Sequence, residues 1–393
     1  MTVRVYFATN RCADDPSDPT EFLDHACGDD PQNLRFGVAE VDLDAGEVNF
    51  TVAEERHVGD PDRQVLGSEE VFDRLRQDMI DDPADCLFFI HGFANSFEQA
   101  LLCTASIGRF YLANGSGAFS KKLHLFAFCW PSDGVLISLP NAYRSDRMDA
   151  ALSGPAIGRT ILKALDFAAT LRPEDRCNRR IHLLAHSMGN WALRHALQHI
   201  QELNPLGPTV VFDQAILAAA DEDADALESD MKLCYLSQLS RRITAYINFQ
   251  DVVLHVSDWT KGNPDRLGKS GPRHPDRVPS NATVVNCSKV ITQKEVTDPG
   301  DVELGEANET THQYYRNDET VRRDIVQVLK GVSDDLIGNR LWVPEKRYYT
   351  LQEIAAEPQA VRRRPRRRPA EARSGVRARG RDAQRAPRPG AQT

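Results

Sequence analysis

The sequence predicts a doubly wound, mostly parallel α/β sheet. Short apolar runs recur along the chain, with room for a helix between one run and the next. Several runs are apolar throughout, which is typical of strands buried on both faces. The segments between them carry apolar residues at helical spacing. Parallel strands joined by such helices wind onto both faces of one sheet.

The predicted strands begin at the start of the chain. Residues 3–8 form the first, residues 10–33 are predicted to be loop, and residues 34–52 form a hairpin interrupted by Asp-Ala-Gly at 44–46. The later strands are predicted over residues 86–90, 123–130, 181–184, 214–220, 243–249 and 283–290, the last of these closing the sheet.

Helices are predicted between these strands. One spans residues 96–113, a second carries an apolar stripe from Ile157 to Ala168, and a third begins after Ser187. Residues 224–238 are predicted as a further helix. A stripe running from Val321 to Leu329 predicts the closing one.

The composition is that of a soluble globular protein. The chain has 393 residues, of which 41% are hydrophobic and 27% charged, and this excludes membrane and fibrous classes. No apolar run approaches the roughly 20 residues that span a bilayer. Arg4 lies where a signal peptide would be apolar, so we expect a cytoplasmic protein without a membrane span.

Eight cysteines occur without a C-x-x-C pair. Cys86, Cys129 and Cys287 fall in or beside predicted strands, where a reduced thiol behaves as a small hydrophobic side chain. Cys12 and Cys27 lack metal-ligand spacing. We therefore expect neither a disulfide nor a metal ion at Cys12 and Cys27.

The charge of the chain is unevenly distributed. Residues 358–393 contain twelve arginines and two acids, so the net charge of −9 leaves about −19 on the preceding residues. We predict one folded domain over residues 1–350 and a disordered tail over residues 351–393. Such a tail can bind nucleic acid or an acidic partner electrostatically, but we expect an unstructured appendage.

The stretch that indicates chemistry is Ala185-His-Ser187-Met-Gly189, which lies between an apolar run and an amphipathic helix. A strand, a tight turn and a helix in that order lift a serine hydroxyl above the sheet edge. Ala185 replaces the first glycine of the G-x-S-x-G pattern. Small residues are needed there and at Gly189, because the turn brings backbone and strands close together. A serine that only caps the helix is the alternative.

A serine nucleophile needs a histidine to take its proton and a carboxylate to orient that histidine. After the strand over residues 243–249 the chain reaches Asp251, and the only histidine after the predicted last strand is His312. Ser187, Asp251 and His312 therefore follow the order serine, acid, histidine that this architecture uses.

Each assignment has a competitor. Asp221 follows the strand over residues 214–220 and could supply the acid, although a solvated acidic turn that caps the next helix is the simpler account. His255 lies four residues beyond Asp251, too close on the same loop to replace His312.

Hydrolysis also needs N–H donors for the developing oxyanion. The backbone N–H of Met188, which follows the serine, is one candidate, and that of Phe93 in His91-Gly-Phe93 is the other.

Taken together, the motifs resemble a family. They are Ala-Thr-Asn-Arg11, Phe-Ile-His-Gly-Phe93 with Asn95 and Ser96, Phe-Cys-Trp-Pro-Ser132, Ala-His-Ser-Met-Gly-Asn190, the Asp251 loop, Arg266-Leu-Gly268 and His312. The set resembles a bacterial family of α/β hydrolases of unknown function in the esterase/lipase superfamily. The resemblance implies a sheet of the α/β-hydrolase type, no metal or organic cofactor, and Ser187, Asp251 and His312 as the catalytic triad. The arginine-rich tail lies outside it.

These observations predict a serine hydrolase that cleaves small-molecule carboxylic esters, thioesters or amides through an acyl-enzyme on Ser187. Phe93, Tyr143 and Trp259 are candidates for lining an acyl pocket, with aromatic core packing as the alternative. The competing hypothesis is a catalytically silent binding protein with this fold, whose basic tail engages nucleic acid or an acidic partner.

Overall fold

The fold is known from a computed structural model of the chain. It describes residues 1–15, 18–26, 33–53, 56–57, 64–113, 119–132, 139–203, 209–229, 231–254, 265–291 and 311–353. The described residues belong to one compact unit, Met1–Ile354. Residues 354–393 of the predicted tail, together with Trp259 and His255, lie outside the described residues. The predicted start of the tail is too early, because Leu351 is a buried residue of the last strand.

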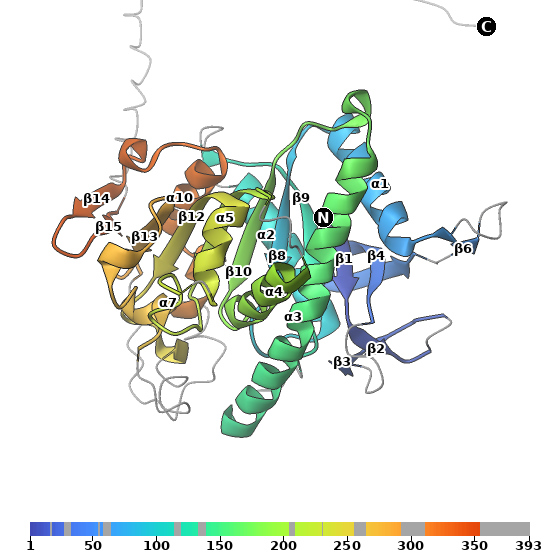
Figure 1. The fold of residues 1–393 in the computed structure, drawn as a ribbon, viewed down its shortest axis with the longest axis horizontal. Coiled ribbons are helices and arrows are strands. Elements are labelled where there is room, and N and C mark those ends of the chain that lie inside the picture. The colour runs from blue at the N-terminus through green and yellow to red at the C-terminus, as the bar shows by residue number, and fades with distance from the viewer. Residues whose placement is uncertain are drawn as a thin grey trace, which may run out of the picture. The chain divides into compact units, whose positions relative to one another are not determined.

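The described residues contain an eleven-stranded sheet in the order β14-β15-β13-β12-β11-β10-β8-β9-β1-β4-β5 (Figure 1). Its strands from β15 to β1 run parallel, and β4, β5 and β14 add antiparallel edges. The sheet is therefore mostly parallel, as predicted. The strands are β1 (Thr2–Thr9), β4 (Arg35–Asp42), β5 (Glu47–Val52), β8 (Asp85–Ile90), β9 (Leu123–Cys129), β10 (Ile181–His186), β11 (Phe212–Ala218), β12 (Ser240–Ile247), β13 (Ala282–Asn286), β14 (Arg340–Val343) and β15 (Tyr348–Leu351).

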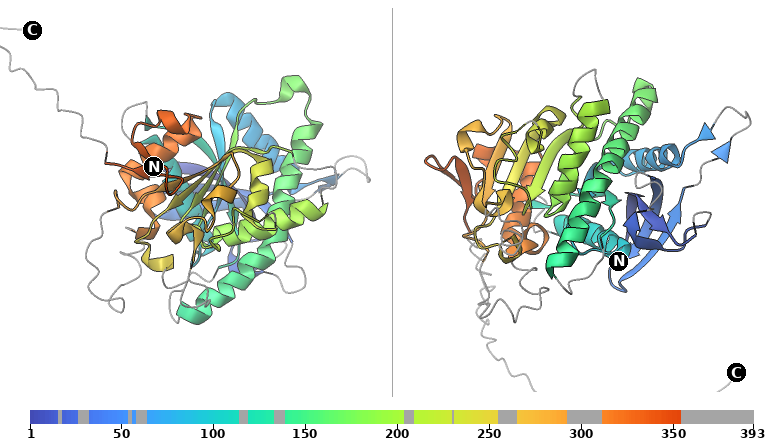
Figure 2. Two further views of the ribbon diagram at one scale, coloured as in Figure 1. Left: turned by 60° about the vertical axis from the view of Figure 1, so that its left-hand side comes forward. Right: turned by 60° about the horizontal axis from the view of Figure 1, so that its bottom comes forward.

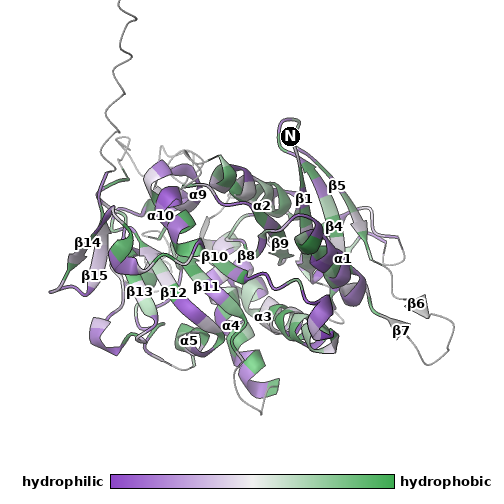
Figure 3. Cartoon of the chain, turned by 90° about the horizontal axis from the view of Figure 1, so that it is seen from above, coloured by the Kyte–Doolittle hydropathy of each residue, from purple (hydrophilic) through white to green (hydrophobic). Residues whose placement is uncertain are grey.

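Helices cover both faces of this sheet (Figures 2 and 3). One face packs on α1 (Gly67–Asp81), α3 (Leu139–Thr170) and α4 (Gly189–Leu203), and the other packs on α2 (Phe97–Leu112) and α10 (Glu319–Leu329). Alternate residues of each strand enter the two cores: Phe88 joins the first and Phe89 the second. The doubly wound prediction is confirmed.

Local sequence sets the helix boundaries where capping residues are available. α2 begins after Ser96, whose Oγ accepts the Gln99 N–H at 3.2 Å, while the Gln99 side chain accepts the Ser96 N–H at 2.8 Å. This reciprocal pair satisfies two N–H groups that a helix start leaves without partners. α10 begins in a similar way, with the Asp318 carboxylate accepting the Val321 N–H at 2.9 Å.

Three secondary-structure predictions are wrong. Residues 10–33 are not all loop, because β2 (Arg11–Ala13) pairs with β3 (Phe22–Ala26). The strand over residues 283–290 is not the last, because β15 returns beside β13 and pairs with β14. The helix over residues 224–238 is replaced by turns, a short 3-10 segment (Leu233–Tyr235) and α5 (Leu236–Leu239).

The lost helix has a physical cause. The Asp223 and Asp225 carboxylates bind Lys232 at 3.0 and 2.5 Å, and Asp223 also binds the buried Arg266 at 2.9 Å. The Lys232 pairs join residues seven and nine positions apart, which an α-helix would separate by about 10–14 Å along its axis, and the Arg266 pair joins Asp223 to another segment. Aspartate is also a weak helix former.

The prediction for Cys12 is also wrong, since it is disulfide-bonded. Cys86, Cys129 and Cys287 are free and buried, as expected. No helix among the described residues is both long and apolar enough to cross a membrane.

Candidate active site

The turn between β10 and α4 (Figure 1) contains Ser187, whose backbone is strained. Its φ of 51° is in the left-handed region, which is unfavourable for a residue with a Cβ. Three hydrogen bonds hold the turn: the Ser187 N–H donates to the Ala218 oxygen at 3.0 Å, and the Ser187 oxygen accepts from Asn190 and Asp221 at 3.0 and 3.1 Å. The side chain is thus fixed at the carboxyl end of β10, just before the first turn of α4.

Two glycines let the loop after β8 approach this turn. A Cβ on Gly189 would lie 2.5 Å from the backbone oxygens of both Ile90 and His91. A Cβ on Gly92 would lie 3.0 Å from the Ser187 Cβ. The predicted need for a small residue at Gly189 is confirmed, and the loop that contains Phe93 packs directly against the serine turn.

Asp251 and His312 form a buried hydrogen-bonded pair. His312 Nδ1 lies 2.8 Å from Asp251 Oδ2, and the two residues are 2% and 1% exposed. The other carboxylate oxygen of Asp251 accepts the Leu254 N–H at 3.0 Å. A carboxylate on Nδ1 fixes the tautomer of a neutral imidazole that keeps the Nε2 lone pair free to accept a proton.

Backbone contacts place this pair at the serine edge of the sheet. β10, β11, β12 and β13 are adjacent and parallel, so the loops that follow them emerge at the same edge. The Asn248 amide donates to the Thr311 oxygen at 2.8 Å, which joins the loop after β12 to the segment that carries His312.

His186 connects the serine turn to His312. Its ring centroid lies 4.8 Å from that of His312, and its Nε2 lies 3.2 Å from the His312 carbonyl oxygen. Burial lowers the pKa of His186 far below its usual value, so the ring is neutral and donates from Nε2. His186, the residue before Ser187, is therefore packed on His312, which in turn binds Asp251. This contact links the serine turn to the Asp251–His312 pair.

Two backbone donors near Ser187 are unused. Among the described residues, the N–H groups of Met188 and Phe93 make no hydrogen bond within the chain. The N–H groups that follow Phe93 are occupied, since Ala94 donates to Asp146 at 3.2 Å and Asn95 to Ser132 at 3.1 Å. The loop is thus fixed while the Phe93 donor stays available.

Asp221 has other partners. Its carboxylate accepts the Tyr143 hydroxyl and lies 3.6 Å from Arg266 Nε. Asp221 is 1% exposed, so the predicted solvated capping turn is wrong. The structure brings Asp251, and not Asp221, to His312. Tyr143 also contacts Phe93, and the centroids of the two aromatic rings are 5.8 Å apart.

Sequence reasoning assigned no role to Arg11, which organises the Phe93 loop. The Arg11 guanidinium is 3% exposed and donates to the backbone oxygens of Asn95 at 2.7 Å and Ser132 at 3.3 Å. Next to it, the His91 ring stacks on Trp130 with centroids 4.8 Å apart. Burial, reinforced by the Arg11 charge, lowers the pKa of His91 to about 3, so this histidine is neutral. The only sequence signal for Arg11 was its place in the Ala-Thr-Asn-Arg11 motif of the family resemblance, because its partners, Asn95 and Ser132, are distant in sequence.

The motif at Arg266 has a comparable supporting role. Gly268 donates its N–H to the Ala220 oxygen at 2.9 Å and accepts the Asn248 N–H at 2.9 Å. It thereby joins the loop after β11 to the loop that carries Asp251. Within the described residues, no group of three or more histidine, cysteine, aspartate or glutamate side chains could hold a metal ion.

A family model for an alpha/beta hydrolase of unknown function (DUF900) matches residues 68–327, about two thirds of the chain. The chain belongs to this family. The match confirms the resemblance and the α/β-hydrolase fold class, and it includes Ser187, Asp251 and His312. A comparison with curated proteins finds no match. The family description names a hydrolase fold and leaves the reaction open.

Proposed function

We propose that the chain is a serine hydrolase that cleaves carboxylic esters through an acyl-enzyme on Ser187. The observation that carries the proposal is the 2.8 Å hydrogen bond between Asp251 and His312, in a buried pair packed beside a strained serine turn. An orienting carboxylate, an imidazole and a serine on such a turn are the groups that acyl transfer requires.

In the proposed reaction, Ser187 Oγ attacks the carbonyl carbon of the ester while His312 Nε2 takes the hydroxyl proton. The tetrahedral intermediate collapses, the bond to the alkoxy group breaks, and His312 returns the proton to the departing alcohol. Water then attacks the acyl-enzyme with His312 as base, which releases the carboxylic acid and restores Ser187. Asp251 keeps the imidazole oriented throughout.

The oxyanion is stabilised by the N–H groups of Met188 and Phe93, which have no other acceptor among the described residues. Donors that are fixed before the reaction cost no reorganisation during it. Losing one such donor raises the barrier by about 2.7–4 kcal/mol in related chemistry.

We assign Tyr143 and Phe93 to the acyl side of the site, because the pair packs next to the loop that supplies the Phe93 donor. Thioesters and amides can be opened by the same groups.

A fluorophosphonate probe tests the proposal directly. The native protein should become covalently labelled, and Ser187→Ala should not. Ser145→Ala, which removes an exposed hydroxyl on α3, is the matched control and should label like the native protein. A folded native protein that stays unlabelled, or labelling that survives in Ser187→Ala, would contradict the assignment and favour a catalytically silent binding protein.

Turnover of p-nitrophenyl esters with acyl chains of two to ten carbons gives the second readout. Asp251→Asn should lower kcat by about 10⁴-fold, as losing the orienting carboxylate does in other serine hydrolases. Asp221→Asn, in the alternative acid, should lower it far less. The reverse ranking would move the acid from Asp251 to Asp221.

A further inference from the structure

A second site lies at the amino ends of the strands, at the edge of the sheet opposite Ser187. An open cavity of about 510 Å³ is lined by α1, α3, β9 and the starts of β8, β10 and β11. Its wall is mostly apolar and includes five phenylalanines from five elements. These are Phe72, Phe88, Phe126, Phe167 and Phe212. The size is within the range of about 300–1,000 Å³ that small-molecule sites occupy.

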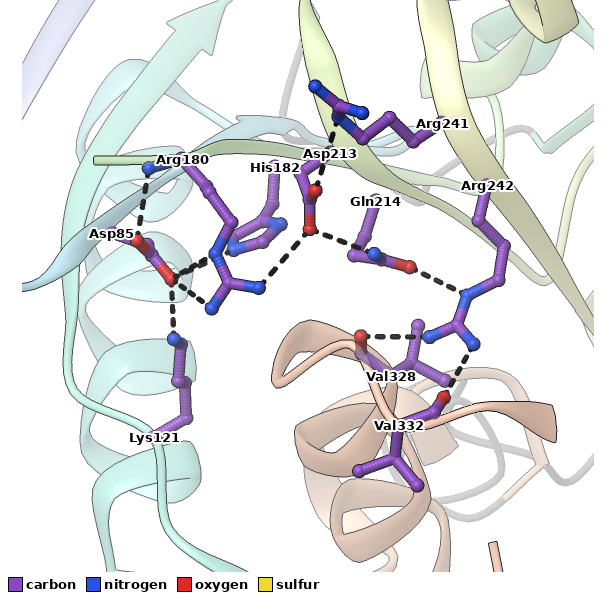
Figure 4. A network of polar contacts seen from close by, with 10 residues as sticks. All are labelled: Asp85, Lys121, Arg180, His182, Asp213, Gln214, Arg241, Arg242, Val328 and Val332. Carbon is purple, nitrogen blue, oxygen red and sulfur yellow. Dashed lines mark hydrogen bonds and ion pairs between the residues drawn. The ribbon is translucent and has the colours of Figure 1, made fainter. Parts of the chain in front are cut away.

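A basic cavity of about 420 Å³ adjoins it. Lys121, Lys122, Arg179 and Arg180 line this cavity around a single carboxylate, that of Asp85. Figure 4 shows Lys121 and Arg180 converging on Asp85, with Arg180 also reaching Asp213.

Part of this positive charge is not neutralised by the chain. Asp85 binds two of the four cations, and Lys122 pairs with the exposed Asp82. Arg179 is exposed and makes no ion pair within the part of the chain that the structure describes. The cavity therefore offers a guanidinium whose paired donors match a carboxylate.

The two cavities meet at Asn178 and Arg179, which line both. Asn178 has a φ of 52°, so the chain turns sharply between β10 and the segment before it. An apolar cavity thus opens beside an unpaired cation. A ligand that satisfies both must combine a hydrocarbon chain with an anionic end.

We propose that these joined cavities bind a single-chain, long-chain carboxylate, with its alkyl chain among the phenylalanines and its carboxylate at Arg179. A neutral lipid would leave the basic cavity without a partner. A short carboxylate would leave the apolar cavity empty. The site lies across the sheet from Ser187, so the proposal is independent of the hydrolase chemistry.

Calorimetric titration of the full-length protein with sodium dodecanoate, below its micelle concentration, tests the site. Burial of two further methylenes should make dodecanoate bind about tenfold tighter than decanoate. Dodecanol and dodecyltrimethylammonium test the charge, and both should bind at least tenfold more weakly than dodecanoate. Equal binding of the cationic amphiphile would overturn the proposal.

Variants locate the binding. Ala168→Trp fills the apolar cavity from an exposed position of α3, and Asp166→Trp adds the same ring to the same helix away from the cavity. Arg179→Glu reverses the charge at the junction, and Arg74→Glu makes the same change at an exposed site on α1 outside both cavities. The first variant of each pair should lose at least tenfold in affinity, while its control binds like the native protein. Melting temperatures verify that all four variants are folded.

Three outcomes would refute the site. The native protein could fail to bind dodecanoate, the affinity could survive both Ala168→Trp and Arg179→Glu, or the protein could bind vesicles of anionic phospholipid but not the monomeric carboxylate. The second outcome would place the ligand elsewhere, including the Ser187 edge. The third would make this face a membrane contact instead.

Discussion

Replacing Glu222 by glutamine should stabilise the protein at alkaline pH and have little effect at pH 5. Glu222 follows β11 and is fully buried. Its Oε2 accepts the Asp223 N–H at 3.0 Å and lies 3.5 Å from the Arg194 guanidinium. Its Oε1 has no hydrogen-bond partner among the described residues. An ionised carboxylate in this position is poorly compensated.

The magnitude follows from the pKa. Burial raises the pKa of Glu222 from 4.5 to about 7, although the charge of Arg194 opposes the change. The folded protein therefore holds this proton up to a higher pH than the unfolded chain does, and its stability falls as the pH rises between the two values. One pKa unit corresponds to about 1.4 kcal/mol, so ionised Glu222 should cost the fold about 3 kcal/mol above pH 8 and less than about 1 kcal/mol at pH 5.

Urea unfolding followed by tryptophan fluorescence, from pH 5 to pH 8.5, measures this contribution. The unfolding free energy of Glu222→Gln should gain about 2 kcal/mol on the native protein across that range. Glutamine keeps an acceptor for the Asp223 N–H, so the comparison isolates the charge. Glu47→Gln, at an exposed position of β5, should show no such gain. A constant difference between Glu222→Gln and the native protein at every pH would refute the reasoning.

Further predictions concern packing and charge elsewhere. Gly189→Ala should destabilise the protein by about 1–3 kcal/mol, because the added Cβ meets two backbone oxygens at 2.5 Å, whereas Gly338→Ala, with no atom within 4 Å, should be neutral. Asp85→Asn should cost about 2 kcal/mol at pH 7. Hydrogen bonds from His182, Lys121 and Arg180 outweigh burial and hold the pKa of Asp85 well below its usual range, so this cost should shrink as the pH falls below about 4. Arg340→Met should cost about 3–5 kcal/mol, because it leaves the buried Asp324 without the guanidinium that binds it at 2.6 and 2.8 Å. Adding Asp324→Leu should recover much of that loss. Urea titrations at pH 7, and at pH 3–7 for Asp85→Asn, check these values. The reasoning would be contradicted by an unchanged unfolding midpoint for Gly189→Ala or by a loss of stability in Asp85→Asn that does not vary with pH. It would also be contradicted by a double variant that is less stable than Arg340→Met.

The central strands could be predicted because most of their residues are apolar and occur in short uninterrupted runs, such as residues 86–90. β8 is buried at all six of its positions, and such a run has few other structures available in a soluble domain. The edges carry weaker patterns. β14 is half-buried or exposed along its length, and nothing in its sequence indicates that it pairs with β15. α1 was not predicted, although Val71, Leu75 and Met79 recur at intervals of four residues, which is typical of a helix.

The candidate site could be predicted as far as chain order determines it. Ser187, Asp251 and His312 each follow a parallel strand, and the carboxyl ends of parallel strands lie at one edge of the sheet. The choice between Asp251 and Asp221 depends on Arg266 and Tyr143, which come from distant segments and occupy Asp221. Contacts of this kind depend on tertiary packing and are not visible in local sequence.

Three strained residues around the serine turn lie at the opposite sheet edge from the ion pairs of Asp85, and Asn178 is a left-handed residue at the Asp85 edge. Ala94, Ser187 and Ala219 have positive φ angles and follow β8, β10 and β11 at the carboxyl edge, while Asp85 gathers its cations at the amino edge of the same strands. The ion pairs of Asp85 stabilise the amino ends of the strands, opposite the strained loops that follow their carboxyl ends. Thermal robustness and loop chemistry should therefore be adjustable by substitutions that do not interfere with each other.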